Sequence, residues 1–98
     1  MKSCVEVVSY RLKEGVSEEM FMEAVDLLAE LLSGESALKK REVFREEDSG
    51  TWVEVAEWTS REAAKQCEAR VMADPRMSEA MALIDESTLR MLFVAQVR

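Results

Sequence analysis

The sequence predicts an α+β fold, in which one antiparallel sheet of four strands carries helices on one face in the chain order β-α-β-β-α-β. Runs rich in β-branched and aromatic residues open and close the chain, and two more flank a turn near its middle. Two stretches with apolar residues at helical spacing separate these runs. At 98 residues the chain fits one domain, residues 1–98, without room for a second core.

The first strand and the first helix are predicted from residues 4–32. Residues 4–12, "CVEVVSYRL", favour a strand and end at the turn signal "KEG". Ser17 is a good N-cap, and the two glutamates after it suit the positive end of a helix dipole. The helix is expected to stop at Ser33-Gly34. Its apolar residues form one stripe that needs a sheet to cover: Phe21, Ala24, Val25, Leu28, Leu31 and Leu32.

Residues 38–46 and 52–59 flank "EDSG" and predict a hairpin of antiparallel strands, in which Gly50 supplies a positive φ. Alternation along the second of these strands separates two sets of side chains. One face receives Trp52, Glu54, Ala56 and Trp58, and the other receives Val53, Val55 and Glu57. Neither face is cleanly polar, so we expect helices on one side and a further cover, such as a second subunit, on the other.

The second helix is predicted to begin almost directly after the third strand. Thr59 and Glu62 match the T-x-x-E capping box, with Ser60 as the alternative cap. Pro75 interrupts the apolar stripe and predicts the start of a short new helix that carries Met77, Ala80, Met81 and Ile84. Residues 89–97, "LRMLFVAQV", predict the closing strand. This order of elements is the ferredoxin-like arrangement.

Composition and charge narrow the class of protein. The balance of 48% hydrophobic and 34% charged residues is typical of a folded soluble domain. A formal net charge of −7 argues against nucleic acid as a partner, and no window is apolar enough to span a membrane. Glu6 breaks a secretory signal before its apolar region begins, so we expect a cytoplasmic protein.

The two cysteines do not predict a metal or redox site. Cys4 and Cys67 lack CxxC spacing, and the chain has no histidine to complete a zinc site. We expect both thiols to be reduced and buried, and no metal ion. The basic cluster is interleaved with glutamates and predicts a charge-protected edge strand rather than an anion site; its members are Lys39, Lys40, Arg41 and Arg45.

The element order together with "EWTSREA", residues 57–63, resembles the dimeric α/β-barrel superfamily, which includes the antibiotic-biosynthesis-monooxygenase-like proteins. A narrower resemblance lies in "ARVMADPRM", residues 69–77, which is similar to a branch of that superfamily with a V-M-A-D-P-R segment before the closing strand. The resemblance implies a homodimer that pairs its sheet faces and a ligand site between sheet and helices.

The resemblance also bears on cofactors. Heme-degrading members use an Asn, a Trp and a His at positions that fall near Val8, Cys67 and Ala80, and this chain contains neither His nor Asn. Quinone-forming members need no metal or flavin, because an electron-rich phenolic substrate supplies electrons to oxygen once it is deprotonated. The resemblance therefore implies a cofactor-independent monooxygenase that acts on an aromatic or polyketide-like molecule, with no cofactor.

Such chemistry needs an apolar cavity and a few groups that stabilise an anion. As catalytic candidates we take Tyr10, Trp58 and Glu57, with Glu54 as a second carboxylate on the same strand. The candidate ligand-binding residues are Trp58, Tyr10, Arg11, Cys67, Arg70 and Met81. Cys67 has no His partner, which argues against a nucleophile.

The alternative function is a non-enzymatic binding or accessory homodimer whose core is filled by its own side chains. Aromatic residues at alternate strand positions commonly fill a core, and Trp52 in particular is expected at the rim of the sheet. Methionines give an adaptable interior without any ligand. A cavity lined by Trp58, Tyr10 and an Arg or Glu would favour a ligand pocket, and a sealed core would favour the alternative.

Overall fold

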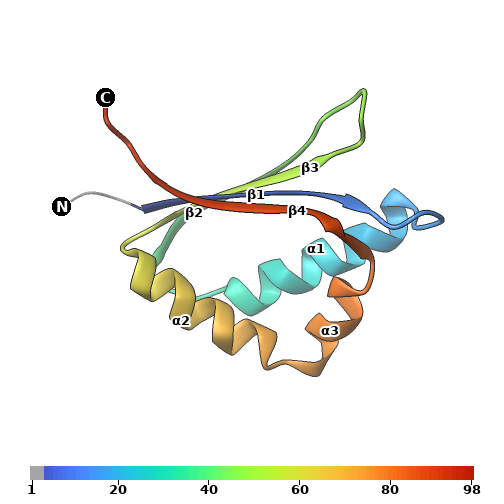
Figure 1. Cartoon of the computed structure of the whole chain (residues 1–98). Coiled ribbons are helices and arrows are strands. Elements are labelled where there is room, and N and C mark those ends of the chain that lie inside the picture. Colours follow the sequence, from blue (N-terminus) through green and yellow to red (C-terminus); the bar gives the residue numbers. More distant parts are fainter. Residues whose placement is uncertain (1–3) are drawn as a thin grey trace.

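The structure is a computed structural model that describes residues 4–98. The order of its elements confirms the predicted β-α-β-β-α-β fold, with the second helical segment divided into two helices (Figure 1). The elements are β1 (Cys4–Leu12), α1 (Glu18–Leu32), β2 (Leu38–Arg45), β3 (Trp52–Trp58), α2 (Arg61–Met72), α3 (Pro75–Met81) and β4 (Ile84–Ala95).

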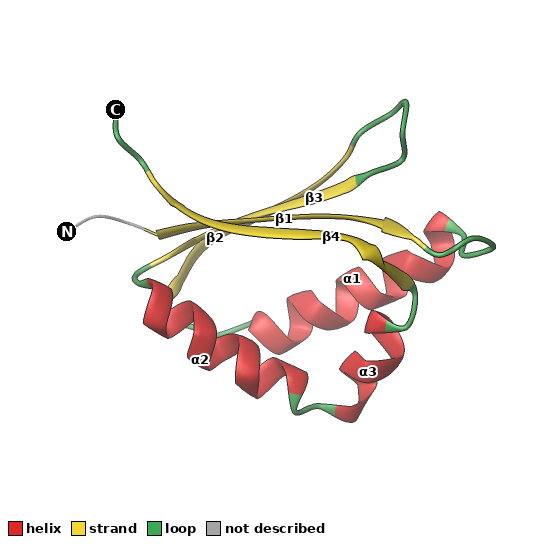
Figure 2. Ribbon diagram, in the orientation of Figure 1, coloured by secondary structure: helices red, strands yellow, loops and turns green. Residues whose placement is uncertain are grey.

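The four strands form one sheet in the order β2-β3-β1-β4, and each neighbouring pair is antiparallel. All three helices lie on the same side of this sheet, and no helix or strand of residues 4–98 lies on the other side (Figure 2). We call these two sides the helix face and the open face. None of the helices in residues 4–98 has the length and apolar character that a membrane-spanning helix requires.

Local signals place α1 and the β2–β3 hairpin where the sequence predicts them. The Ser17 side chain caps α1 by accepting a hydrogen bond from the Met20 N–H. Gly34, just beyond the helix end, has φ +84°, and Gly50 in the hairpin has φ +72°. Both values lie in the left-handed region that residues with a Cβ rarely adopt, so glycine fits these turns.

The cap of α2 differs from the expected capping box. Ser60, and not Thr59, is the N-cap, and its hydroxyl accepts a hydrogen bond from the Ala63 N–H. Thr59 still belongs to the sheet edge, where its N–H donates to the Ala37 carbonyl. The T-x-x-E match is therefore wrong as a cap, because tertiary pairing holds its first residue outside the helix. Pro75 begins α3 as predicted, with Asp74 as its cap.

The closing strand is longer at its start than predicted. It begins at Ile84 rather than Leu89 and ends at Ala95. Its first residues pair Leu12 with Ile84, after which the register shifts, and the Arg11 N–H donates to the Thr88 hydroxyl at 2.8 Å. The polar run "DEST" did not predict a strand, because the alternation of apolar and polar residues fails at a bulge. Ile84, expected on the short helix, is therefore a strand residue and is buried.

The core lies between the helix face and the helices in two clusters. One cluster contains Trp58 and Cys67, and the other contains Tyr10, Phe21, Trp52 and Ile84. Trp52, expected at the rim, is only 5% exposed, and its ring meets the Phe21 ring edge-on at 5.0 Å between centroids. Both cysteines are free thiols; Cys67 is buried as expected, whereas Cys4 is only partly buried.

Candidate functional site

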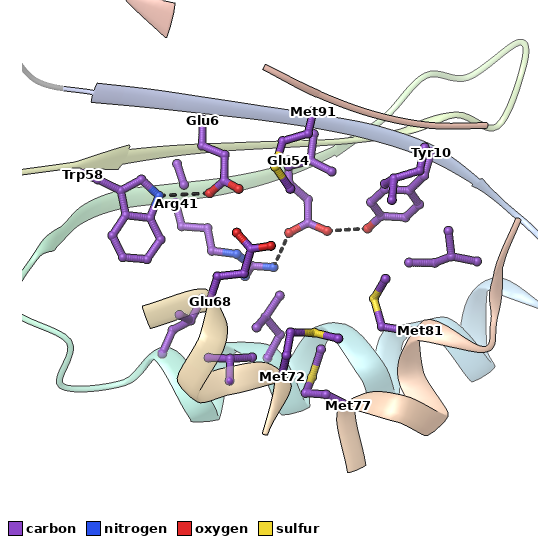
Figure 3. Close-up of a pocket in the computed structure, with 17 residues that line it drawn as sticks. Glu6, Tyr10, Arg41, Glu54, Trp58, Glu68, Met72, Met77, Met81 and Met91 are labelled. Atoms are coloured by element: carbon purple, nitrogen blue, oxygen red, sulfur yellow. Dashed lines mark hydrogen bonds and ion pairs between the residues drawn. The ribbon is translucent and has the colours of Figure 1, made fainter. Parts of the chain in front are cut away.

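A cavity of about 230 Å³ lies between the helix face of the sheet and the helices. Its wall is mainly aliphatic and thioether, and it includes Val8, Leu28, Val71, Met77, Met81 and Leu89. Six side chains with polar atoms also line it: Glu6, Tyr10, Arg41, Glu54, Trp58 and Glu68 (Figure 3). The site is thus an apolar chamber with a small polar group, which is the usual composition of a small-molecule pocket.

The strand period aims most of these polar side chains at the cavity. Glu6 and Tyr10 are four residues apart on β1, so both point to the helix face. Glu54 and Trp58 have the same spacing on the neighbouring strand β3. Arg41 joins them from β2, because it pairs with a helix-face residue of β3. Three adjacent strands therefore supply five of the six groups.

Glu54 is the centre of a hydrogen-bonded chain. One carboxylate oxygen accepts from the Arg41 guanidinium at 2.7 Å, and the other accepts from the Tyr10 hydroxyl (Figure 3). The side chains of Arg41 and Glu54 are 13% and 17% exposed, so this is a largely buried ion pair. Burial, together with the neighbouring Glu54 charge, raises the pKa of Tyr10. Tyr10 is therefore a neutral phenol that holds Glu54 in place.

Glu6 has a different environment from Glu54. One of its carboxylate oxygens accepts from the Trp58 indole N–H at 3.0 Å, and no other hydrogen bond reaches this carboxylate from residues 4–98. Burial raises the pKa of Glu6, and the charges of Glu68 and Glu54 raise it further. The Trp58 hydrogen bond and the Arg41 charge act in the opposite direction without cancelling that rise.

The raised pKa of Glu6 predicts a fall in stability with rising pH. Because the folded pKa lies above the ordinary 4.5, the folded state binds more protons than the unfolded state between the two values. The free energy of unfolding contributed by Glu6 is therefore highest below that interval and falls as pH rises through it. We expect Glu6→Gln to gain stability relative to wild type as pH increases from about 4 to about 7.

Urea unfolding at a series of pH values measures this difference. Glu23→Gln, at an exposed position of α1, is the matched control for loss of a glutamate charge. A stability difference between Glu6→Gln and wild type that stays constant or shrinks with rising pH would contradict the assignment.

The structure brings four of the candidate residues to the cavity and leaves four elsewhere. Tyr10, Glu54, Trp58 and Met81 line it. Arg11 and Glu57 alternate onto the open face of their strands. Cys67 and Arg70 lie on α2 beside the cavity and do not line it.

Cys67 and Arg70 instead take part in a separate contact with Glu35. The Arg70 guanidinium is largely exposed and pairs with Glu35, and the same nitrogen lies 3.5 Å from the Cys67 sulfur. Burial raises the pKa of the Cys67 thiol, and the Glu35 charge adds to the rise. The thiol is thus held in its protonated, weakly nucleophilic form.

Sequence reasoning missed Glu6 and Arg41. The signal for Glu6 was present, because the alternation that places Tyr10 on the helix face also places Glu6 there. Arg41 lies in the charge-rich edge strand β2, where its pairing with Ala56 places it on the helix face and its side chain is 13% exposed. Lys40 pairs with Glu57 of the open face, and Arg45 is 43% exposed beside Glu18. No group of three or more His, Cys, Asp or Glu side chains within residues 4–98 is arranged to hold a metal ion.

The fold has close counterparts among solved structures. No protein-family model matches the chain, and no curated protein matches its sequence. A mutant of SnoaB, a cofactor-independent oxygenase from Streptomyces nogalater, superposes with a TM-score of 0.82 at 16% identity, over 100% of this chain and 96% of that one. A monooxygenase from the ActVA-Orf6 gene of Streptomyces coelicolor, solved with nanaomycin D, gives 0.73 at 18% identity, over 99% and 89%.

A dimeric ferredoxin-like protein of unknown function from Thermobifida fusca gives a TM-score of 0.69 at 13% identity, over 97% of this chain and 92% of that one. These neighbours confirm that the chain has a ferredoxin-like fold. At these identities the likeness concerns the fold.

Proposed function

We propose that the protein is a cofactor-independent oxygenase that oxidises a small phenolic ring compound in the cavity. The observation that carries the proposal is the placing of Glu6, Glu54, Arg41 and Trp58 in an apolar chamber between sheet and helices. A volume of about 230 Å³ lies just below the roughly 300–1,000 Å³ of common ligand pockets. It suits a molecule with few fused rings.

The chemistry requires only a base, an apolar enclosure and an anion-stabilising donor. Removal of a phenolic proton gives an electron-rich anion that passes electrons to dioxygen. A ring carbon ortho or para to the phenolate oxygen, which carries one hydrogen, then becomes a carbonyl with one atom of dioxygen, and the phenolate oxygen becomes the second carbonyl of a quinone. The other oxygen atom leaves as water with that ring hydrogen and the proton held by the base. The aliphatic wall excludes bulk water, and the guanidinium of Arg41 stabilises developing negative charge.

The structural neighbours support this proposal as analogues. SnoaB is a cofactor-independent oxygenase, and the Streptomyces coelicolor monooxygenase was solved with nanaomycin D as its ligand. Both proteins are oxygenases with the same fold, and oxygenation is the class of reaction that the cavity supports.

The open face supports a homodimer as the working form. Its central row consists of Val55, Val7 and Leu92 on three adjacent strands, with Val5 and Val94 in the next row. Leu92 is 60% exposed and Val94 is 42% exposed in the single chain. An apolar band of this kind is typical of an interface, and the related Thermobifida fusca structure is dimeric. We infer that a second copy covers it.

Oxygen uptake tests the proposed reaction directly. We expect wild-type protein to accelerate oxygen consumption with at least one member of a panel of hydroxynaphthalenes and anthrones, beyond the spontaneous rate. Trp58→Ala enlarges the cavity and removes the hydrogen bond to Glu6, so the enzyme-dependent rate should fall by about 100-fold or more.

Val97→Ser, at a position that is 90% exposed beyond β4, is the control and should retain the wild-type rate. Absence of enzyme-dependent uptake across the whole panel would contradict the oxygenase.

The second candidate is a non-enzymatic binding protein. It is favoured by one observation: each Glu54 oxygen already has a partner within the protein, one in Tyr10 and the other in Arg41. Saturable binding of a panel member without oxygen uptake would identify this function.

A further inference from the structure

We propose that Glu6 is the residue that accepts the hydroxyl proton of the phenolic ligand, while Glu54 positions Arg41 and Tyr10 around it. This inference rests on the proposed function and assigns its central step to one carboxylate of the cavity.

The two partly buried strand carboxylates, Glu6 and Glu54, differ in the hydrogen bonds that they already accept. Glu54 already accepts from a guanidinium and a phenol, one on each oxygen. Taking up a ligand proton would remove the negative charge that pairs Glu54 with the Arg41 guanidinium. Glu6 accepts only from the neutral indole of Trp58. Within residues 4–98, the other Glu6 oxygen accepts no hydrogen bond, so it can accept one from a ligand.

Trp58 fixes the orientation of Glu6. Its indole N–H binds one oxygen at 3.0 Å from the strand neighbouring β1, so the carboxylate is held at the cavity wall (Figure 3). An indole is a donor only and carries no charge, so it positions the carboxylate without taking over its role as a base. A fixed base of this kind avoids the entropy cost of orienting a free side chain in the reaction.

The charges around the cavity decide which ligand fits. Within residues 4–98, Glu6, Glu54 and Glu68 line it with one cation, Arg41. Proton transfer from a neutral phenol to Glu6 breaks the ligand O–H bond and forms an O–H bond on the carboxylate. The electron pair stays on the phenolate oxygen. The total charge of the cavity is therefore unchanged by the step, since the negative charge only moves from Glu6 to the ligand.

A ligand with its own carboxylate would add a further negative charge to this set. The structure thus assigns the cavity to phenols that are neutral outside the reacting hydroxyl. A hydroxynaphthalene should therefore bind more tightly than the same ring with an added carboxylate.

The kinetic test compares Glu6→Gln with wild type on whichever panel member is turned over. Glutamine keeps an oxygen that can accept from Trp58 but cannot take a proton at neutral pH, so the fold of the site is preserved. We expect kcat to fall by about 100-fold or more, with KM changed by less than about threefold. The wild-type rise of kcat/KM with pH, which reports the base, should disappear in the variant.

Glu23→Gln, exposed on α1, is the control and should keep both the wild-type rate and its pH profile. Loss of activity in Glu6→Gln with an unchanged pH profile would overturn the assignment, because it would indicate a structural role.

A binding test separates this inference from the proposed reaction. The probes are 2-naphthol and 2-methoxynaphthalene. They share a ring system, but in the second probe a methyl group replaces the hydroxyl hydrogen. Wild type should bind 2-naphthol about tenfold more tightly, because a hydrogen bond to a charged acceptor is among the stronger ones. In Glu6→Gln this preference should shrink to about twofold or less.

Each outcome of the two tests is informative. If the preference collapses in the variant but no panel member is oxidised by wild type, the oxygenase fails and Glu6 remains the acceptor. If oxidation occurs but the preference and kcat persist in Glu6→Gln, the oxygenase stands and the assignment of Glu6 is wrong. If neither probe binds to wild type, the assignment is also wrong.

Discussion

Arg41→Met should lower the free energy of unfolding by about 3 kcal/mol or more, because it leaves the largely buried Glu54 carboxylate without its ion partner. Methionine keeps much of the arginine stem, so the loss of apolar contact is small. The remaining Tyr10 hydroxyl cannot compensate a full charge. Urea unfolding at neutral pH, followed by tryptophan fluorescence, measures the change.

Two further variants separate charge from packing. Lys40→Met alters the residue before Arg41 on β2, whose side chain is 67% exposed. It should lower the free energy of unfolding by less than about 0.5 kcal/mol. The double variant Arg41→Met/Glu54→Gln should recover a large part of the loss, because the unpaired charge is gone. A double variant no more stable than Arg41→Met would show that the ion pair does not account for the effect.

Val55→Lys should convert a dimer into single chains, with a dissociation constant raised by about 1,000-fold or more. Val55 lies in the central row of the open face, between β2 and Val7 of β1. Across a two-fold axis, a lysine there would be desolvated in both copies at once. Light scattering at micromolar concentration should therefore give two chains per particle for wild type and one for the variant.

Met22→Lys introduces the same side chain on an exposed position of α1 and should leave the dimer intact. Wild-type protein that scatters as a single chain at this concentration would refute the dimer.

Much of the fold was predictable because local signals and tertiary structure agree in most elements. The Ser17 cap, the Gly50 turn and Pro75 at the start of α3 each act through neighbouring residues alone. The two errors in element boundaries occur where pairing across the sheet decides the outcome. Thr59 is held by Ala37, and β4 starts at Ile84 because Leu12 pairs with it.

The site was predictable only in part, for a related reason. Tyr10 and Trp58 are large and partly apolar, so their alternation identifies them as residues of the helix face. Glu6 and Arg41 share that face, but charged residues in a strand are ordinarily solvated. Alternation along β1 places Glu6 on that face. Whether Glu6 and Arg41 line a cavity or meet solvent depends on how the helices pack against the sheet.

The most direct test of the ligand cavity is a titration with 2-naphthol followed through the methyl signals of protein labelled with ¹³C-methyl methionine. Met72, Met77, Met81 and Met91 line the cavity, whereas Met20 and Met22 lie on the exposed side of α1. An aromatic ring in the cavity should shift the first four signals in a saturable manner and leave the signals of Met20 and Met22 unchanged. Equal shifts in both groups, or no shift at saturating ligand, would contradict the cavity as the binding site.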